Sequence, residues 1–183
     1  MIPLKKMRAS HQFQCFWLRR RRSGLEWQKI ISKEKKNEEI RRSVMTRANV
    51  KYTGGMQFVA SADSGHAVIM DADADVGGSN TGSRPMELLL MGIGGCSGMD
   101  IISILKKKKQ TITGLEAQVS GTMAEDYPHK YTEISIEYIV RGKAVSEEAV
   151  KRAVQLSMDK YCSVKATLEG SAKINFSYKI IEE

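Results

Sequence analysis

RPMELLLMGIGGCSGMDIISIL, residues 84 to 105, is the stretch that decides the fold of this chain. After its first residue it carries charge only at Glu87 and Asp100, and Pro85 suits the first turn of a helix. Four lysines, Lys106 to Lys109, follow at the end where the dipole of a helix favours cations. Because the stretch is apolar on every face, it predicts a buried central helix.

Segments typical of strands lie on both sides of this helix. Upstream, apolar and polar residues alternate in three runs separated by glycine-containing turns, and downstream they alternate in three more. These runs are residues 47–52, 56–62, 66–70, 114–123, 131–140 and 172–181. Between the last two, Ser146 is a candidate N-cap for an amphipathic helix that reaches Cys162. The order βββαββαβ predicts an α+β fold.

The positive charge of the chain is confined to one end. The whole chain has 29 Lys+Arg and 21 Asp+Glu, a formal net charge of +8. Residues 1 to 44 hold 13 of the basic and 4 of the acidic residues, a net of +9, which leaves 16 and 17 for residues 45 to 183, a net of −1. The charge of the body therefore gives no reason to expect a nucleic acid partner.

Residues 1 to 44 are predicted to be a basic N-terminal extension to a domain of residues 45 to 183. No helix or strand periodicity persists through the extension, and its first 25 residues contain arginines but no acidic residue. Three interpretations stay open: sequence upstream of a true start at Met45, a targeting presequence, or an arm for nucleic acid or a membrane.

Three cysteines, Cys15, Cys96 and Cys162, are too few and too widely spaced for a disulfide scaffold or a metal site. The expected location is therefore a reducing compartment, the cytoplasm. The acidic run that starts at Asp71 has Val76 where a calcium loop needs glycine. We expect neither a metal nor another cofactor, and we assign no role to Cys15.

Cys96 lies among four glycines, each of which weakens a helix by about 1 kcal/mol relative to alanine. One explanation is close packing, with Cys96 an inert buried side chain. The other is a helix break near Gly94-Gly95, which would place Cys96 at a new helix N-terminus, where the thiolate is favoured. The residues alone leave both explanations open.

Cys162 favours a reactive role for Cys96. It follows the second helix, whose apolar face Tyr161 completes, and it precedes Ser163, a candidate cap for a further turn. Two packed helices could then bring the two thiols face to face, and a disulfide between them needs Cα atoms within about 7 Å. A thiolate that reduces a peroxide becomes a sulfenic acid, which a second thiol converts to a disulfide.

The central apolar run also has the length of a membrane-spanning helix. Leu88 to Leu105 is 18 residues long with one charge, and four lysines follow it. However, Asp100 in mid-span is costly in lipid, and the amphipathic strands on both sides need a core helix to cover them. A soluble protein without a membrane partner is expected, and a membrane-anchored protein is the alternative.

The body resembles the OsmC/Ohr hydroperoxide-resistance family, in particular its OsmC-like subgroup of predicted redox proteins. The resemblance spans roughly Asn49 to Ile181, and its most specific runs are RPMELLLM (84–91) leading to GGC (94–96), DIISIL (100–105) and DKYCSV (159–164). It implies an intertwined homodimer with two sites at the subunit interface. It also implies that Cys96 reduces organic hydroperoxides, that Cys162 forms the disulfide, and that a dithiol reductant restores the pair.

Two positions depart from the pattern of the family's peroxidases. These carry an arginine after a Thr-Gly-Gly turn, where Thr53-Gly54-Gly55 is followed here by Met56. They carry a glutamate directly after the proline, where this chain has Met86 and places Glu87 one residue later, about 100° around a helix. Arg84 and Glu87 are the candidate substitutes. The alternative is a non-peroxidase module that binds a small hydrophobic ligand or exchanges thiols in the same cleft.

Overall fold

The computed structural model describes residues 28, 29, 32, 33 and 45 to 183. The interpretations of residues 1 to 44 therefore fall outside the described chain, apart from those four positions. By its contacts the chain divides into two compact units, and the first three strands pass through both. One unit includes residues 45 to 50 and 60 to 67, and the other holds residues 51 to 59 and 68 to 183.

The first sheet is built from β1 (Ala48–Gly54), β2 (Gln57–Ala62) and β3 (Ala67–Met70), in the order β1-β2-β3. The chain reverses between strands at glycines with positive φ, Gly55 at 58° and Gly65 at 79°, a conformation that favours glycine. The strands pair in chain order, as three runs separated by short glycine-containing turns predict.

Asp71 organises the loop of residues 71 to 83, which follows β3 and contains the short helix η1 (Ala74–Val76). Its carboxylate is 2% exposed and accepts hydrogen bonds from the backbone N–H groups of Thr81, Ala72 and Ser79 and from the Thr81 hydroxyl. These bonds, the ones from Thr81 above all, lower the pKa of Asp71 to about 2. The loop that leads into the central helix is therefore folded around a buried charge.

Helix α3 (Pro85–Lys107) is the predicted central helix, and it runs without interruption. Of the two explanations left open for the glycines, the helix break near Gly94-Gly95 is therefore excluded, and Cys96 lies in mid-helix. A Cβ atom at Gly94 would lie 3.0 Å from Val119 Cγ2, and one at Gly98 would lie 3.6 Å from Leu115 Cδ2. Gly94 therefore serves close packing of α3 against the next strand, whereas a Cβ atom at Gly98 would make an ordinary contact.

The burial of α3 is one-sided. Its buried residues, among them Ile93, Ile101 and Leu105, lie on the side that packs against the second sheet and the later helices. On the opposite side, Met91 is 55% exposed and Met99 is 72% exposed. Among the described residues, α3 is the one helix whose length and composition would allow it to span a membrane. Its packed side is that of a core helix.

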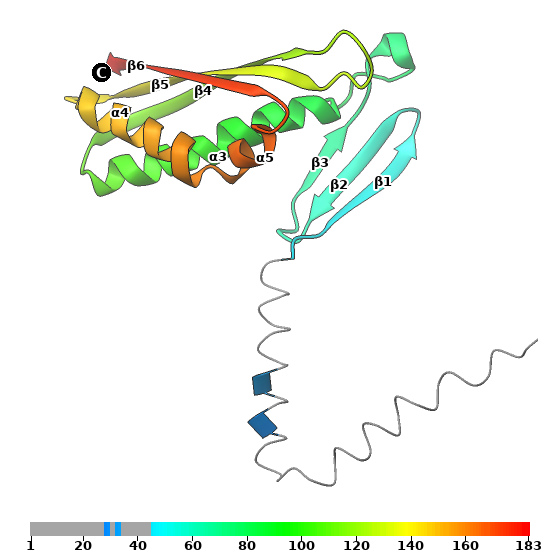
Figure 1. Ribbon diagram of the computed structural model, residues 1–183. Coiled ribbons are helices and arrows are strands. Elements are labelled where there is room, and N and C mark those ends of the chain that lie inside the picture. Colours follow the sequence, from blue (N-terminus) through cyan, green and yellow to red (C-terminus); the bar gives the residue numbers. More distant parts are fainter. Residues whose placement is uncertain (1–27, 30–31, 34–44) are drawn as a thin grey trace, which may run out of the picture. The chain divides into compact units, whose positions relative to one another are not determined.

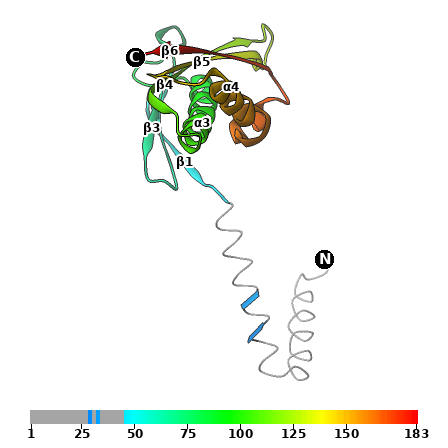
Figure 2. The ribbon, with the colours of Figure 1, turned by 90° about the vertical axis from the view of Figure 1, so that its left-hand side faces the viewer.

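The second sheet consists of β4 (Thr111–Met123), β5 (Tyr131–Lys143) and β6 (Lys173–Glu182), with β5 in the centre. β4 pairs with β5 in the antiparallel sense, and β6 pairs with β5 in the parallel sense. The helices α3 and α4 lie side by side on one face of this sheet (Figures 1 and 2). As the alternation predicts, Ile134, Ile136 and Tyr138 of β5 are buried in the core, whereas Glu133 and Ser135 are exposed.

Helix α4 (Glu147–Leu156) begins as predicted at Ser146, whose hydroxyl oxygen accepts a hydrogen bond from the backbone N–H of Ala149 at 3.3 Å. It does not continue to Cys162. Residues Ser157–Tyr161 form a π-helical turn, η2, closed by a 2.8 Å hydrogen bond from the N–H of Cys162 to the carbonyl of Ser157. A short helix, α5 (Ser163–Leu168), follows and leads to β6.

The π turn corrects the predicted apolar face of this segment. An uninterrupted α-helix would place Tyr161 within about 20° of Val154 and would turn Cys162 about 80° away from it. In the structure Tyr161 is 48% exposed, whereas Cys162 is 4% exposed. The wider turn therefore moves the cysteine into the core and the tyrosine out of it.

Candidate active site

The structure brings Cys96 and Cys162 together, although 66 positions separate them in the chain. Cys96 is half-buried on α3, and Cys162 is buried at the end of η2. The two are free thiols, and Cys96 is close enough to Cys162 to act on its pKa both as a hydrogen-bonding neighbour and through its charge. One thiol of the pair is therefore within reach of solvent, and the other is shielded.

Burial raises the pKa of the Cys162 thiol from its ordinary value of 9.0 to about 11, and the neighbouring Cys96 adds to the increase. The backbone N–H of Lys165 lies 3.4 Å from the Cys162 sulfur and acts in the opposite direction. Cys162 therefore keeps its proton near neutral pH. This contact also makes Cys162 the N-cap of α5, so the cap predicted at Ser163 is wrong by one residue.

A buried set of hydrogen bonds, which the sequence did not reveal, surrounds the pair. The Tyr138 hydroxyl of β5 donates to Ser97 Oγ at 2.6 Å, and Ser97 Oγ donates to the carbonyl of Ile93 at 2.7 Å. The Tyr138 oxygen also lies 3.4 Å from Met158 Sδ. Burial raises the pKa of Tyr138 to about 12, so the hydroxyl stays protonated and able to donate.

Ser157 joins η2 to α3 in this set. It is fully buried, and its hydroxyl lies 3.1 Å from Asp100 Oδ2 and 3.3 Å from the carbonyl of Ser97. Both acceptors belong to α3, one residue and one helical turn after Cys96. Polar residues in apolar surroundings were the available sequence signal for these buried hydrogen bonds. Ser97 and Asp100 interrupt an apolar helix, and Ser157 precedes the apolar Met158.

The two candidate helper residues lie elsewhere in this chain. Arg84 forms an ion pair with Asp73 at 2.6 Å and donates to Asn80 Oδ1 at 2.6 Å. Glu87 accepts a 2.9 Å hydrogen bond from the backbone N–H of Arg84 and thereby caps α3. Nine residues before Cys96, Glu87 lies about 13 Å away along the helix axis and on its opposite side. Their roles at the thiols stay predictions, and within one chain neither side chain is directed at Cys96.

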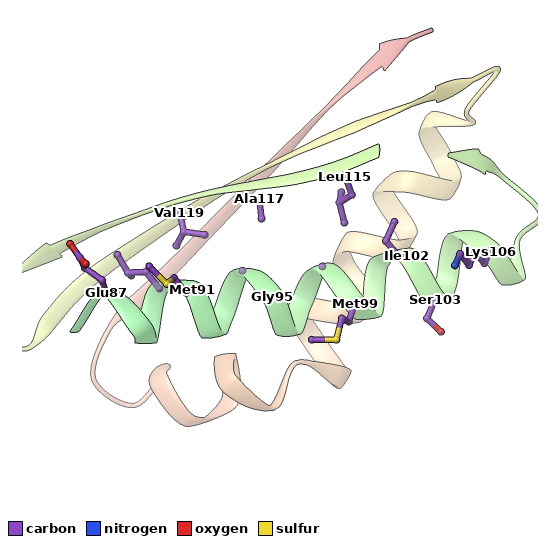
Figure 3. A pocket seen from close by; sticks show the side chains of 13 residues that line it. Glu87, Met91, Gly95, Met99, Ile102, Ser103, Lys106, Leu115, Ala117 and Val119 are labelled. Carbon is purple, nitrogen blue, oxygen red and sulfur yellow. The ribbon is translucent and has the colours of Figure 1, made fainter. Parts of the chain in front are cut away.

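A groove of 1130 Å³ runs along α3 on the side that intrachain packing leaves open. Figure 3 shows Leu115, Ala117 and Val119 of β4 above the helix, with Met91 and Met99 among the residues that line the groove from α3. Cys96 is not part of the lining. The thiol pair therefore lies outside the groove.

Comparison with known proteins identifies the family. The model of the OsmC-like protein family matches residues 78 to 177, more than half of the chain. The chain belongs to the OsmC-like family. Protein YhfA of Escherichia coli strain K12 is 37% identical over 135 residues, which make up 74% of this chain and 98% of YhfA. The matched residues include both cysteines of the candidate site.

Solved structures share the OsmC-like fold. A hypothetical protein from Aquifex aeolicus VF5 has a TM-score of 0.67 at 33% identity, over 76% of this chain and 98% of that one. An OsmC-like protein from Mycoplasma pneumoniae has a TM-score of 0.65 at 20% identity, over 75% and 97%. The organic hydroperoxide resistance protein OhrB of Bacillus subtilis has a TM-score of 0.52 at 20% identity, over 74% and 98%. The last two show the fold alone.

Proposed function

We propose that this protein is a thiol-dependent redox protein that reduces organic hydroperoxides through Cys96 and Cys162 in the cytoplasm. The observation that carries the proposal is the unequal pair: a half-buried thiol beside a buried thiol with a raised pKa. Because Cys162 holds its proton near neutral pH, we assign the attack on the peroxide to Cys96. The thiolate is the nucleophile toward peroxides, and the nucleophile is the thiol that solvent can reach.

The reaction proceeds in two steps. The Cys96 thiolate attacks one oxygen of the hydroperoxide, the O–O bond breaks, the alcohol leaves with a proton, and Cys96 becomes a sulfenic acid. The Cys162 sulfur then attacks the Cys96 sulfur, the S–O bond breaks, and water leaves as the disulfide forms. A dithiol reductant supplies the two electrons and two protons that restore both thiols.

The active form in this proposal is a homodimer, as the family resemblance implies. Its motivation is the open side of α3, where Met91 and Met99 are more than half exposed along an apolar groove. A second copy would cover this surface. It would also supply a second Arg84 and a second Glu87, whose copies within one chain are engaged at the start of α3.

The decisive test counts thiols after addition of cumene hydroperoxide, with Cys15→Ser as the background so that only the pair reports. We expect this background to lose two thiols per chain, Cys96→Ser to lose none, and Cys162→Ser to lose one as a trappable sulfenic acid. Unchanged hydroperoxide consumption by Cys96→Ser would show that the proposal is wrong.

The second candidate function is the binding of a small hydrophobic ligand without turnover. Two observations favour it: the groove of 1130 Å³ has apolar walls, and Met86, at the position of a peroxidase glutamate, packs against the core. Native mass spectrometry of the purified protein distinguishes the two functions. A retained apolar molecule, together with no loss of thiols in cumene hydroperoxide, would favour the binding function.

A further inference from the structure

Ser157 occupies an unusual place for a fully buried serine. Its carbonyl accepts the hydrogen bond from the N–H of Cys162 that closes the π turn, and its hydroxyl is bonded to α3. Besides the direct contact between the two thiols, a hydrogen-bonded connection runs from the carbonyl of Ser97 to the Ser157 hydroxyl, and from the Ser157 carbonyl to the N–H of Cys162. Ser157 is therefore bonded directly to both elements that carry the thiols, whereas Tyr138 links Ser97 and Met158 from β5.

The position of Cys162 is held from three directions. Its N–H donates to Ser157, its carbonyl accepts from the N–H of Ala166 at 3.1 Å, and its sulfur accepts from the N–H of Lys165. The donors of the last two bonds, Ala166 and Lys165, belong to α5, so these bonds fix Cys162 only relative to α5. Of the three bonds, only the one to Ser157 joins Cys162 to η2. The hydroxyl of the same serine joins η2 directly to α3. Loss of that hydroxyl would leave the π turn packed but no longer bonded to the helix of Cys96.

Asp100 completes the contact. A buried hydroxyl has one hydrogen to donate, and a charged acceptor makes the stronger bond. The distances agree, at 3.1 Å to the Asp100 carboxylate and 3.3 Å to the Ser97 carbonyl. Asp100 follows Cys96 by four residues, so it lies on the same side of α3.

We propose that Ser157, anchored by Asp100, is a positioning residue that sets the placement of Cys162 against Cys96 and so determines how readily the two form a disulfide. The proposal deepens the proposed function, because it concerns the same thiol pair. It assigns Ser157 and Asp100 no contact with the substrate. Their contribution is to the second step, closure of the disulfide, and not to the attack of Cys96 on the peroxide.

The experiment measures the thiol–disulfide equilibrium of the pair in glutathione buffers, in the Cys15→Ser background. One oxidised glutathione takes two electrons and two protons from the pair, which gives the protein disulfide and two reduced glutathiones. We expect Ser157→Ala to lower the equilibrium constant for the protein disulfide about tenfold, which raises the reduction potential by about 30 mV. Asp100→Ala should have a similar effect, and Asp100→Asn, which keeps an oxygen acceptor, should stay within about threefold of the background.

Ser146→Ala is the matched control, because it removes a hydroxyl that caps α4 without touching α3. It should lower the melting temperature and leave the equilibrium constant unchanged. A Ser157→Ala constant equal to that of the background overturns the proposal, and so does an equal shift in Ser146→Ala. If Ser157→Ala does not fold, Asp100→Ala at its partly exposed position decides in the same way.

The glutathione equilibrium also separates this proposal from the proposed function. A pair that forms its disulfide in glutathione and shifts as expected, in a protein that does not consume cumene hydroperoxide, supports the positioning role and rejects the peroxidase. If the background protein consumes hydroperoxide and the Ser157→Ala equilibrium constant equals that of the background, the peroxidase is supported and the positioning role is rejected.

Discussion

The two sides of α3 are built from different kinds of contact. On the side that faces η2, hydrogen bonds join Ser97 and Asp100 to neighbouring elements, and Cys96 is the neighbour of Cys162. On the groove side, Met91 and Met99 present apolar surface that no part of the described chain covers. The difference shows that the candidate redox site lies on the side of α3 that is packed within the chain. The exposed apolar surface lies on another side.

The largest effect that this comparison predicts is on stability. Ile101→Ala removes a fully buried side chain and should lower the free energy of unfolding by about 2–5 kcal/mol. Met99→Ala, at a position 72% exposed, should stay within about 0.5 kcal/mol. Urea denaturation at low protein concentration measures both. Equal losses there would contradict the one-sided burial, whereas a Met99→Ala cost that grows with protein concentration would indicate a second copy on the open side.

The second effect concerns the reactivity of the buried thiol. With a pKa of about 11, Cys162 is about 1% thiolate at pH 9, so its alkylation should still be accelerating well above that pH. Because the pKa in the folded state is raised, the contribution of this thiol to stability is complete below pH 9 and is lost as pH rises toward 11. Mass-spectrometric mapping of alkylated sites follows Cys162 alone, and the urea-unfolded chain is the control. A folded-state midpoint at or below pH 9 would break the prediction.

The smallest effect compares two adjacent glycines. A Cβ atom at Gly95 would meet nothing within 4 Å, so Gly95→Ala should stabilise the helix by up to about 1 kcal/mol. Gly94→Ala should lose that gain, because its Cβ would press on Val119 Cγ2 at 3.0 Å. Thermal unfolding of the two variants at low protein concentration measures the difference. A gain at Gly94 as large as that at Gly95 would show that close packing does not require this glycine.

Much of the fold could be predicted because local signals agree with the packing. Pro85 and the lysines after Leu105 mark the ends of α3, Ser146 caps α4, and the alternation around Ile136 follows the buried face of β5. The parallel pairing of β6 with β5 had no such signal, because strand partners are chosen by tertiary packing.

The candidate site was predicted only in part, for reasons that lie in the backbone. Periodicity at 3.6 residues per turn assumes an unbroken α-helix, so it placed Tyr161 in the core, and the π turn reverses that assignment. The glycines around Cys96 were ambiguous, because glycine occurs both where a helix breaks and where a helix packs closely against a neighbouring element. The hydrogen bonds of Ser97 and Ser157 join distant segments, and only the assembled fold brings them together.

The placement of the two cysteines in the chain has a consequence for the folding of the oxidised protein. Cys162 lies in the crossover that carries the chain from β5 to its parallel neighbour β6, and Cys96 lies on α3, which precedes β4 and β5 in the chain. A disulfide between them would close a loop of about 66 residues. In the loop-entropy model it would lower the entropy of the unfolded chain and so raise the free energy of unfolding by about 4 kcal/mol. Oxidation would then stabilise the protein and reduction would remove that stabilisation, so resistance to unfolding would follow the redox state of the cell.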